Sequence, residues 1–188
     1  METILIIIIA VLVGGIIAYF LLKKKENEDN KKDTCIIRTN YKQLNSKYVF
    51  LGLNISKDCN LAGWQNFHGG RQDWKLVGTC NHTKLRGSYL ADIFKNIPIK
   101  TASELKKYIQ KNQKVIKQNV DFFNKEMKDI GMTKNTVFIV LGKTAQDYFK
   151  DYFQNVYKNK VVNYLHYSAW GTKKEWAEGL WKKLGIEN

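Results

Sequence analysis

From residue 35 onward, short runs of continuous apolar residues alternate with longer segments of helical periodicity. The three clearest runs cover residues 48–53, 137–141 and 161–165, and a weaker one covers residues 88–94. Continuous apolar character, rather than strict alternation, is typical of strands covered on both faces of a parallel sheet. Strands separated by helices predict a three-layer α/β/α domain with right-handed crossovers.

The segments between these runs carry apolar residues at the three- and four-residue spacing of amphipathic helices. We expect Ser103 to cap a helix that runs to about Gln110, with Glu104 in its first turn. Two later helices are predicted to stop before Gly131 and at Gly185. We interpret three apolar stripes as core-facing surfaces, formed by Ile116, Val120, Phe123, Met127 and Ile130, by Tyr148, Phe149, Tyr152, Phe153 and Val156, and by Trp176, Leu180, Trp181 and Leu184.

Residues 56–85, which follow the first predicted strand, fit neither period. Long irregular segments of this kind usually carry function. Phe67 is a candidate for stacking on a nucleobase, with His68 beside it, although Phe67 and Trp64 could equally pin the segment to the core. Among its glycines and asparagines the segment holds Trp64, Phe67, His68, Arg71, Trp74 and His82.

The N-terminus is uniformly apolar, from Ile4 to Leu22, and three lysines follow directly. As a helix, residues 4–22 would be about 28 Å long, enough to cross a hydrocarbon core. We predict an uncleaved anchor at 1–22, a flexible charged tether at 23–34 and one domain at 35–188. The positive-inside rule places the C-terminal domain in the cytoplasm of a single-pass membrane protein.

The chain has a formal net charge of +14, and all 31 lysines and arginines follow the predicted anchor. Such a surface attracts nucleic acid or an anionic lipid surface, although ordinary solubility explains it equally well. Three cysteines without a framework spacing fit reduced thiols in a cytosolic domain.

Polar side chains stand where the first and last predicted strands end. Asn54 follows the first strand, and His166 and Ser168 follow the last. Ligands of open α/β sheets sit beyond the carboxyl ends of the strands, so these residues are candidates for a site. Asn54 can hold a water or read a base edge, or it can be an ordinary turn residue. His166 can donate to a carbonyl that gains negative charge, or it can be a structural histidine. Asp92, at the end of the weaker strand, is either a buried polar anchor or a site residue.

Two other segments only partly match known motifs, those of a phosphate-binding loop and of a zinc site. We expect neither a metal nor a cofactor. Gly142-Lys143-Thr144 resembles the end of a phosphate-binding loop, but the earlier glycine that this loop requires is replaced by Val137. Cys59, His68, Cys80 and His82 do not have the paired spacing of a zinc site.

Two segments resemble motifs of the uracil-DNA glycosylase superfamily. Residues 52–56, Gly-Leu-Asn-Ile-Ser, are similar to the loop after the first strand in that family, and residues 166–168, His-Tyr-Ser, are similar to its last motif. Residues 85–92 also look like the second-strand region of the family. The resemblance covers about residues 46–170.

The resemblance implies a four-stranded parallel sheet of order 2-1-3-4 and hydrolysis of the N-glycosidic bond of a flipped base. Asn54 would place the water, His166 would bond the carbonyl of the departing base, and Phe67 would stack on its ring. The other residues expected to bind substrate are Gly52, Leu53, Ser56, His68, Asp92 and Ser168.

This chain departs from the family at two prolines, which are replaced by Ile55 and Tyr167. Proline stiffens such loops, and a fold can be inherited without its chemistry. The prediction is therefore a membrane-anchored protein that binds a nucleobase, nucleotide or nucleic acid, with glycosidic hydrolysis as its candidate reaction. The alternative is a non-catalytic nucleotide-sensing or interaction module on the same fold.

Overall fold

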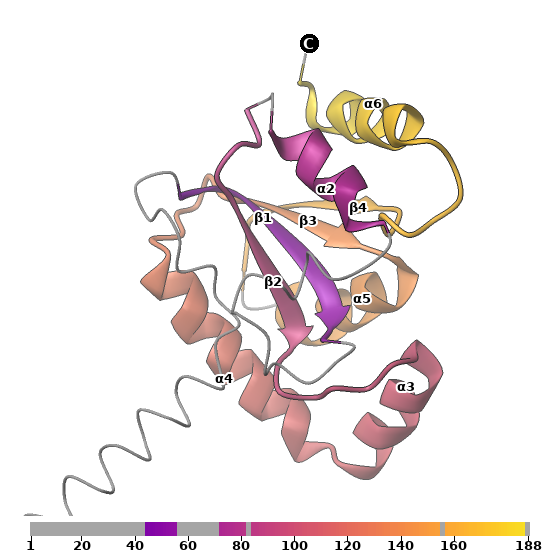
Figure 1. Cartoon of the computed structure of the whole chain (residues 1–188). Helices are drawn as coiled ribbons and strands as arrows, with labels where there is room; N and C mark the ends of the chain where they lie inside the picture. The colour runs from indigo at the N-terminus through magenta and orange to yellow at the C-terminus, as the bar shows by residue number, and fades with distance from the viewer. Residues whose placement is uncertain (1–43, 56–71, 82–83, 155–156, 187–188) are drawn as a thin grey trace, which may run out of the picture. The chain divides into compact units, whose positions relative to one another are not determined.

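The computed structural model describes residues 44–55, 72–81, 84–154 and 157–186 (Figure 1). The predicted anchor and tether lie outside these ranges, as do Ser56, Phe67 and His68. None of the helices within these ranges has the length and apolar character that a membrane span requires.

Four parallel strands form the central sheet, in the order β2-β1-β3-β4. They are β1 (Asn45–Asn54), β2 (Ser88–Phe94), β3 (Val137–Leu141) and β4 (Lys160–Tyr164). The parallel α/β architecture and the 2-1-3-4 order are confirmed. All four strands arise from the predicted apolar runs, because a strand covered on both faces needs apolar side chains at successive positions.

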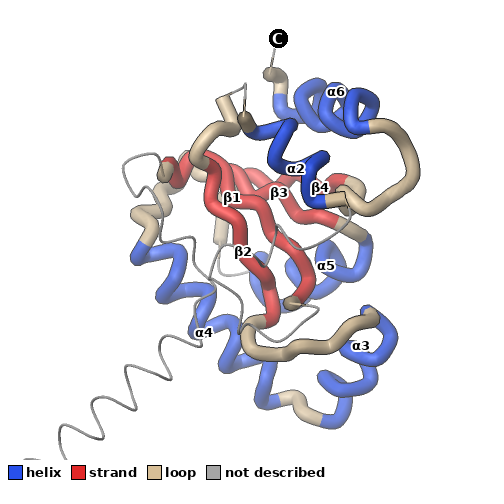
Figure 2. The backbone as a smooth tube through the Cα atoms, viewed as in Figure 1, coloured by secondary structure: helices blue, strands red, loops and turns tan. Residues whose placement is uncertain are grey.

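Helices connect the strands and cover both faces of the sheet (Figure 2). They are α2 (Asp73–Cys80), α3 (Ala102–Lys111), α4 (Lys114–Asp129), α5 (Lys143–Tyr148), the π-helical turn η3 (Phe149–Phe153) and α6 (Lys173–Leu184). The predicted ends at Gly131 and Gly185 are confirmed: Ile130 and Gly185 are the C-caps of α4 and α6.

Two expectations about the helices were wrong. Residues 73–80 of the supposedly irregular segment form α2, which is too short for a clear period and begins without a side-chain cap. The cap of α3 is Thr101, not Ser103. Thr101 has an extended backbone, and its hydroxyl accepts a hydrogen bond from the Glu104 backbone N–H at 3.3 Å, whereas Ser103 already lies within the helix.

Two apolar clusters lie on opposite faces of the sheet. Val49 and Leu51 point into one cluster, together with Phe123 of α4 and Phe149 at the start of η3. The neighbouring side chains Tyr48 and Phe50 point into the other, against Leu76 of α2 and Trp176 and Leu180 of α6. Side chains alternate between the faces of a strand, so this parity also determines which residues beyond the core share a face.

Candidate functional site

A cavity of about 420 Å³ lies at the carboxyl edge of the sheet. Six of the nine predicted site residues line it: Gly52, Leu53, Asn54, Asp92, His166 and Ser168. The other three, Ser56, Phe67 and His68, lie outside the described residues. Residues more than a hundred positions apart in the sequence thus meet around one space, at the edge where ligands of parallel sheets are bound.

Strand parity explains why these side chains meet. Gly52 and Asn54 continue the face of β1 that Tyr48 and Phe50 direct into the second apolar cluster. Gly52 is paired with Asp92 of β2, so the missing side chain of Gly52 leaves space directly beside the Asp92 carboxylate. The cavity lies beyond the strand ends, and its lining also includes Leu53 and Ala145, which belong to the first apolar cluster.

The side-chain amide of Asn54 is held in one orientation. Its Nδ2 atom lies 2.8 Å from each of three backbone carbonyl oxygens, those of Ile55, Ile97 and Ile99. An amide oxygen among three carbonyl oxygens would be repelled, so the nitrogen must face them. Asn54 therefore ties the end of β1 to the segment after β2, and Oδ1 is the only polar atom of its side chain left for a ligand.

Hydrogen bonds to Ser168 set the tautomer of His166. The backbone N–H of Ser168 donates to Nδ1 of His166 at 3.2 Å, and the Ser168 hydroxyl lies 2.7 Å from the same atom. A backbone N–H can only donate, so Nδ1 is an acceptor and the proton of the neutral ring is on Nε2. No residue in the described ranges accepts a bond from Nε2. His166 thus brings one N–H donor to the cavity, as a bond to a ligand carbonyl requires.

The imidazole of His166 is neutral near pH 7. Burial lowers its pKa below the ordinary value of 6.5, while the negative charge of Asp73 acts in the opposite direction. The ring stacks on Tyr167, with 4.2 Å between the ring centroids. Burial raises the pKa of the Tyr167 phenol, and so do the carboxylates of Asp73 and Asp92 and the hydrogen bond to Asp73. Tyr167 therefore stays protonated and links the His166 loop to the first turn of α2.

A second connection to the same loop comes from Lys75 of α2. Its side chain is 3% exposed, and its Nζ atom donates to the carbonyl oxygens of Ala169 at 3.0 Å and Gly171 at 2.7 Å. Together, Asp73 and Lys75 hold the loop that carries His166 and Ser168. This contribution of Lys75 was not predictable from the sequence, because a buried lysine that donates to distant backbone carbonyls has no local signature.

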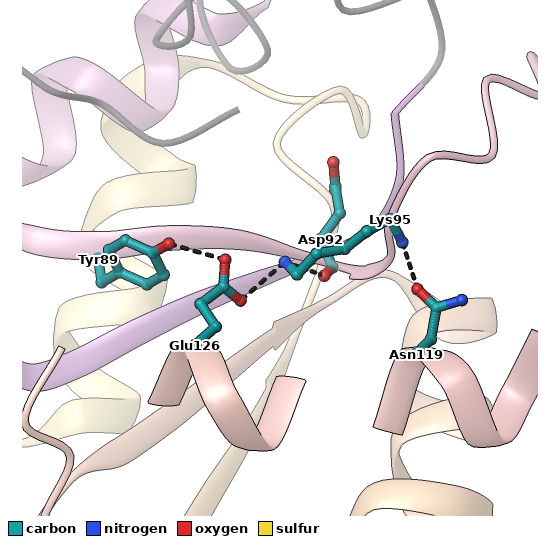
Figure 3. Close-up of polar contacts among 5 residues, drawn as sticks. All are labelled: Tyr89, Asp92, Lys95, Asn119 and Glu126. Carbon is teal, nitrogen blue, oxygen red and sulfur yellow. Dashed lines mark hydrogen bonds and ion pairs between the residues drawn. The ribbon is translucent and has the colours of Figure 1, made fainter. Parts of the chain in front are cut away.

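The end of β2, which carries Asp92, is supported from the opposite face of the sheet (Figure 3). Nζ of Lys95 donates to the backbone carbonyl oxygen of Asp92 at 3.0 Å and forms an ion pair of 2.7 Å with Glu126 of α4. Glu126 also accepts a bond of 2.8 Å from the Tyr89 hydroxyl, and Asn119 accepts one of 2.6 Å from the Lys95 backbone N–H. This buried network fixes the strand end while the Asp92 carboxylate, on the other face, lines the cavity.

The cavity also has two lysines on its wall: Lys100, which was not singled out from the sequence, and Lys143, which belongs to the rejected phosphate-loop motif. Lys143 bonds Asp147 at 2.6 Å on the exposed surface of α5. Within the described ranges, no group of His, Cys, Asp and Glu side chains is arranged to hold a metal ion. Of the four rejected zinc candidates only Cys80 is described, and burial raises the pKa of its thiol to about 12.

The site therefore combines one amide acceptor, one imidazole N–H donor and one buried carboxylate around a space large enough for an aromatic base. Comparison of the chain with protein-family models, with curated proteins and with solved structures finds no significant match.

Proposed function

We propose that the cavity binds a nucleobase, presented as a free nucleotide or within a nucleic acid. The observation that carries this proposal is that Asn54 and His166 line one base-sized space, and that their hydrogen bonds within the protein leave Oδ1 and the Nε2–H group for a ligand. A base presents acceptors and donors on one planar edge, and the two groups offer it one of each kind. The sheet order, which is the one implied by the resemblance to the uracil-DNA glycosylase superfamily, also supports the proposal.

The candidate reaction is hydrolysis of the N-glycosidic bond of the bound nucleotide. The water oxygen would bond C1′ of the sugar as the C1′–N bond breaks, the water would lose a proton to solvent, and the released base would take one up. The acceptor Oδ1 of Asn54, which has two lone pairs, would hold the attacking water by one of its hydrogens, while His166 donates to the base carbonyl as negative charge moves onto the leaving base. Extrusion of a base from a duplex costs a few kcal/mol, which contacts in the pocket and to the phosphates must offset.

Exposed tryptophans in α2 and in the loop after β4 fit a polynucleotide partner. Trp170 is fully exposed in the loop held by Lys75, and Trp74, which precedes Lys75, is half exposed. Such side chains can stack on unpaired bases, and the positive charge of the chain attracts phosphates.

A non-catalytic nucleotide-sensing or interaction module is the second candidate, and one observation favours it. The Nδ2 atom of Asn54 serves three backbone carbonyls, so this residue has a structural role that does not depend on catalysis. A module of this kind would bind the same ligands without cleaving them.

The test uses the full chain in a mild detergent with single- and double-stranded DNA that contains uracil or other single bases. Abasic sites that form with the wild type, and that are lost in Asn54→Ala and His166→Ala while Asn135→Ala retains activity, support the enzyme. Thermal unfolding of each variant identifies losses that come from misfolding. Binding without cleavage supports the module, and the absence of both contradicts the proposal.

We also propose that residues 4–22 anchor the chain, with the C-terminal domain in the cytoplasm near an anionic lipid surface. The apolar run and the lysines that follow it support this orientation. The test is carbonate extraction of membranes from expressing cells, followed by protease treatment of intact cells or spheroplasts. Release of the chain by carbonate, or digestion of its domain from outside, contradicts the proposal. Lipid binding through charge alone would be lost at high salt.

A further inference from the structure

The polar groups of the cavity differ in the ligand groups that they can bond. Asp92 restricts the ligand most. Its side chain is 8% exposed and lines the cavity next to Gly52. An ionised carboxylate accepts hydrogen bonds and cannot donate them. It has about four lone-pair positions, so a bond within the protein still leaves acceptors for a ligand.

The nearby cation Lys95 does not change the character of this carboxylate. Lys95 contacts only the backbone oxygen of Asp92, and its charge is paired with Glu126 on the opposite face of the sheet (Figure 3). Lys100 and Lys143 also line the cavity, so its charges are mixed. The carboxylate of Asp92 lies next to Gly52 and close enough to Tyr167 to add, with Asp73, to the rise that burial causes in the pKa of Tyr167. This carboxylate favours N–H groups and disfavours carbonyl oxygens.

We propose that Asp92 selects a base edge with two adjacent N–H donors, which among the common nucleobases is the edge of guanine. This inference rests on the proposed function and names the base class. The N1–H and N2–H groups of guanine can bond the two carboxylate oxygens in parallel, which is the strongest arrangement for a planar donor pair. The O6 carbonyl, next to N1–H, is an acceptor for a donor such as the Nε2–H group of His166.

The other bases fit this carboxylate less well. Uracil and thymine offer a single N–H between two carbonyl oxygens, which the carboxylate would repel. Cytosine and adenine place a ring-nitrogen acceptor beside their amino group, so they can form only one bond. Hypoxanthine has the shape of guanine but lacks the N2 amino group. The difference in affinity between the two bases therefore measures the bond from N2–H to the second carboxylate oxygen.

The experiment measures the dissociation constants of guanosine, inosine and uridine for the full wild-type chain in detergent. A second arm uses short deoxyadenosine strands with one central guanine, hypoxanthine or uracil, and so distinguishes a free nucleoside from a polynucleotide as the source of the base. We expect guanine to bind roughly tenfold or more tightly than either alternative, because each loses a bond to a charged acceptor.

Equal affinity for guanosine and inosine, or tighter binding of uridine, overturns the inference but leaves the proposed function intact. Failure of every base to bind in both arms overturns the proposed function and the inference with it. These outcomes depend on the wild-type chain, so they stand even where a variant fails to fold.

The matched variants are Asp92→Asn and Asp129→Asn. Asp92→Asn replaces the carboxylate by an amide, which has N–H donors of its own. It should reduce the preference for guanine over uracil by roughly tenfold or more. Asp129→Asn removes the same charge at the exposed end of α4 and should leave the preference unchanged. An unchanged preference in folded Asp92→Asn assigns base selection to another group and overturns the inference.

Discussion

Gly142 and His166 are in such close contact that a Cβ atom built on Gly142 would lie 3.3 Å from the Cβ atom of His166. Gly142 follows β3 and His166 follows β4, so this contact joins the ends of two neighbouring strands at the cavity. The Gly142 backbone, with φ of +88° and ψ of 146°, is in a region that residues other than glycine rarely adopt.

Substitution Gly142→Ala should therefore both destabilise the protein and displace His166. We expect a loss of about 1–3 kcal/mol in the free energy of unfolding, measured by urea denaturation, together with weaker nucleoside binding. Gly131→Ala is the control, because Gly131 also has a positive φ, of +69°, but has no atom within 4 Å of the added Cβ. Gly131→Ala should cost about 1–2 kcal/mol and leave binding unchanged. Equal effects of both substitutions on binding would show that the Gly142 contact does not position His166.

The lowered pKa of His166 predicts a dependence of stability on pH. Between the folded-state pKa and the ordinary value of 6.5, the unfolded chain binds more protons than the folded chain. The free energy of unfolding should thus be highest above pH 6.5 and fall as the pH is lowered through the folded-state pKa, by at most about 1.4 kcal/mol per pH unit. His166→Gln should remove this part of the slope in urea denaturation series.

An NMR titration of the His166 ring tests the cause of the same shift. Asp73→Asn should lower the pKa of His166 further, because the Asp73 charge opposes the effect of burial. If His166 titrates at or above its ordinary pKa in the wild type, burial of the ring does not lower its pKa.

Removal of the Lys75 ammonium group should loosen the loop that carries His166. Lys75→Met leaves the carbonyl oxygens of Ala169 and Gly171 without their donor, and we expect a loss of roughly 1–3 kcal/mol in unfolding free energy. Hydrogen exchange of residues 166–171 should become faster. The control, Lys174→Met, removes an exposed lysine from α6 and should change the unfolding free energy by less than about 0.5 kcal/mol. Unchanged exchange in Lys75→Met would mean that the loop is held by other contacts.

The ion pair behind Asp92 should be far more sensitive to the loss of one partner than to the loss of both. Lys95→Met leaves the buried carboxylate of Glu126 uncompensated and should cost about 3–5 kcal/mol of unfolding free energy. The double substitution Lys95→Met with Glu126→Leu should recover much of that loss, because no buried charge remains. The measurement is a double-mutant cycle by urea denaturation, and additive losses would indicate that the pair is not coupled.

Much of the scaffold was predictable because strands and helices leave local patterns. The apolar runs located all four strands, since strands covered on both faces must be apolar throughout. Gly185 marked the end of α6 because its left-handed backbone favours glycine. Helix α2 was not predicted, because eight residues define no clear period. The Thr101 cap was not predicted, because Ser103, two residues later, is of an equally suitable type for capping.

The sequence alone identified four residues of the site, because they are polar and follow predicted strands or end them: Asn54, Asp92, His166 and Ser168. A parallel sheet brings the carboxyl ends of its strands to one edge, so these residues were expected to lie together. Only the tertiary structure decided what each group can do. The amide orientation of Asn54, the tautomer of His166 and the support from Lys75 all depend on hydrogen bonds to backbone atoms. Every residue has such backbone atoms, so no residue type in the sequence marks where these bonds will form.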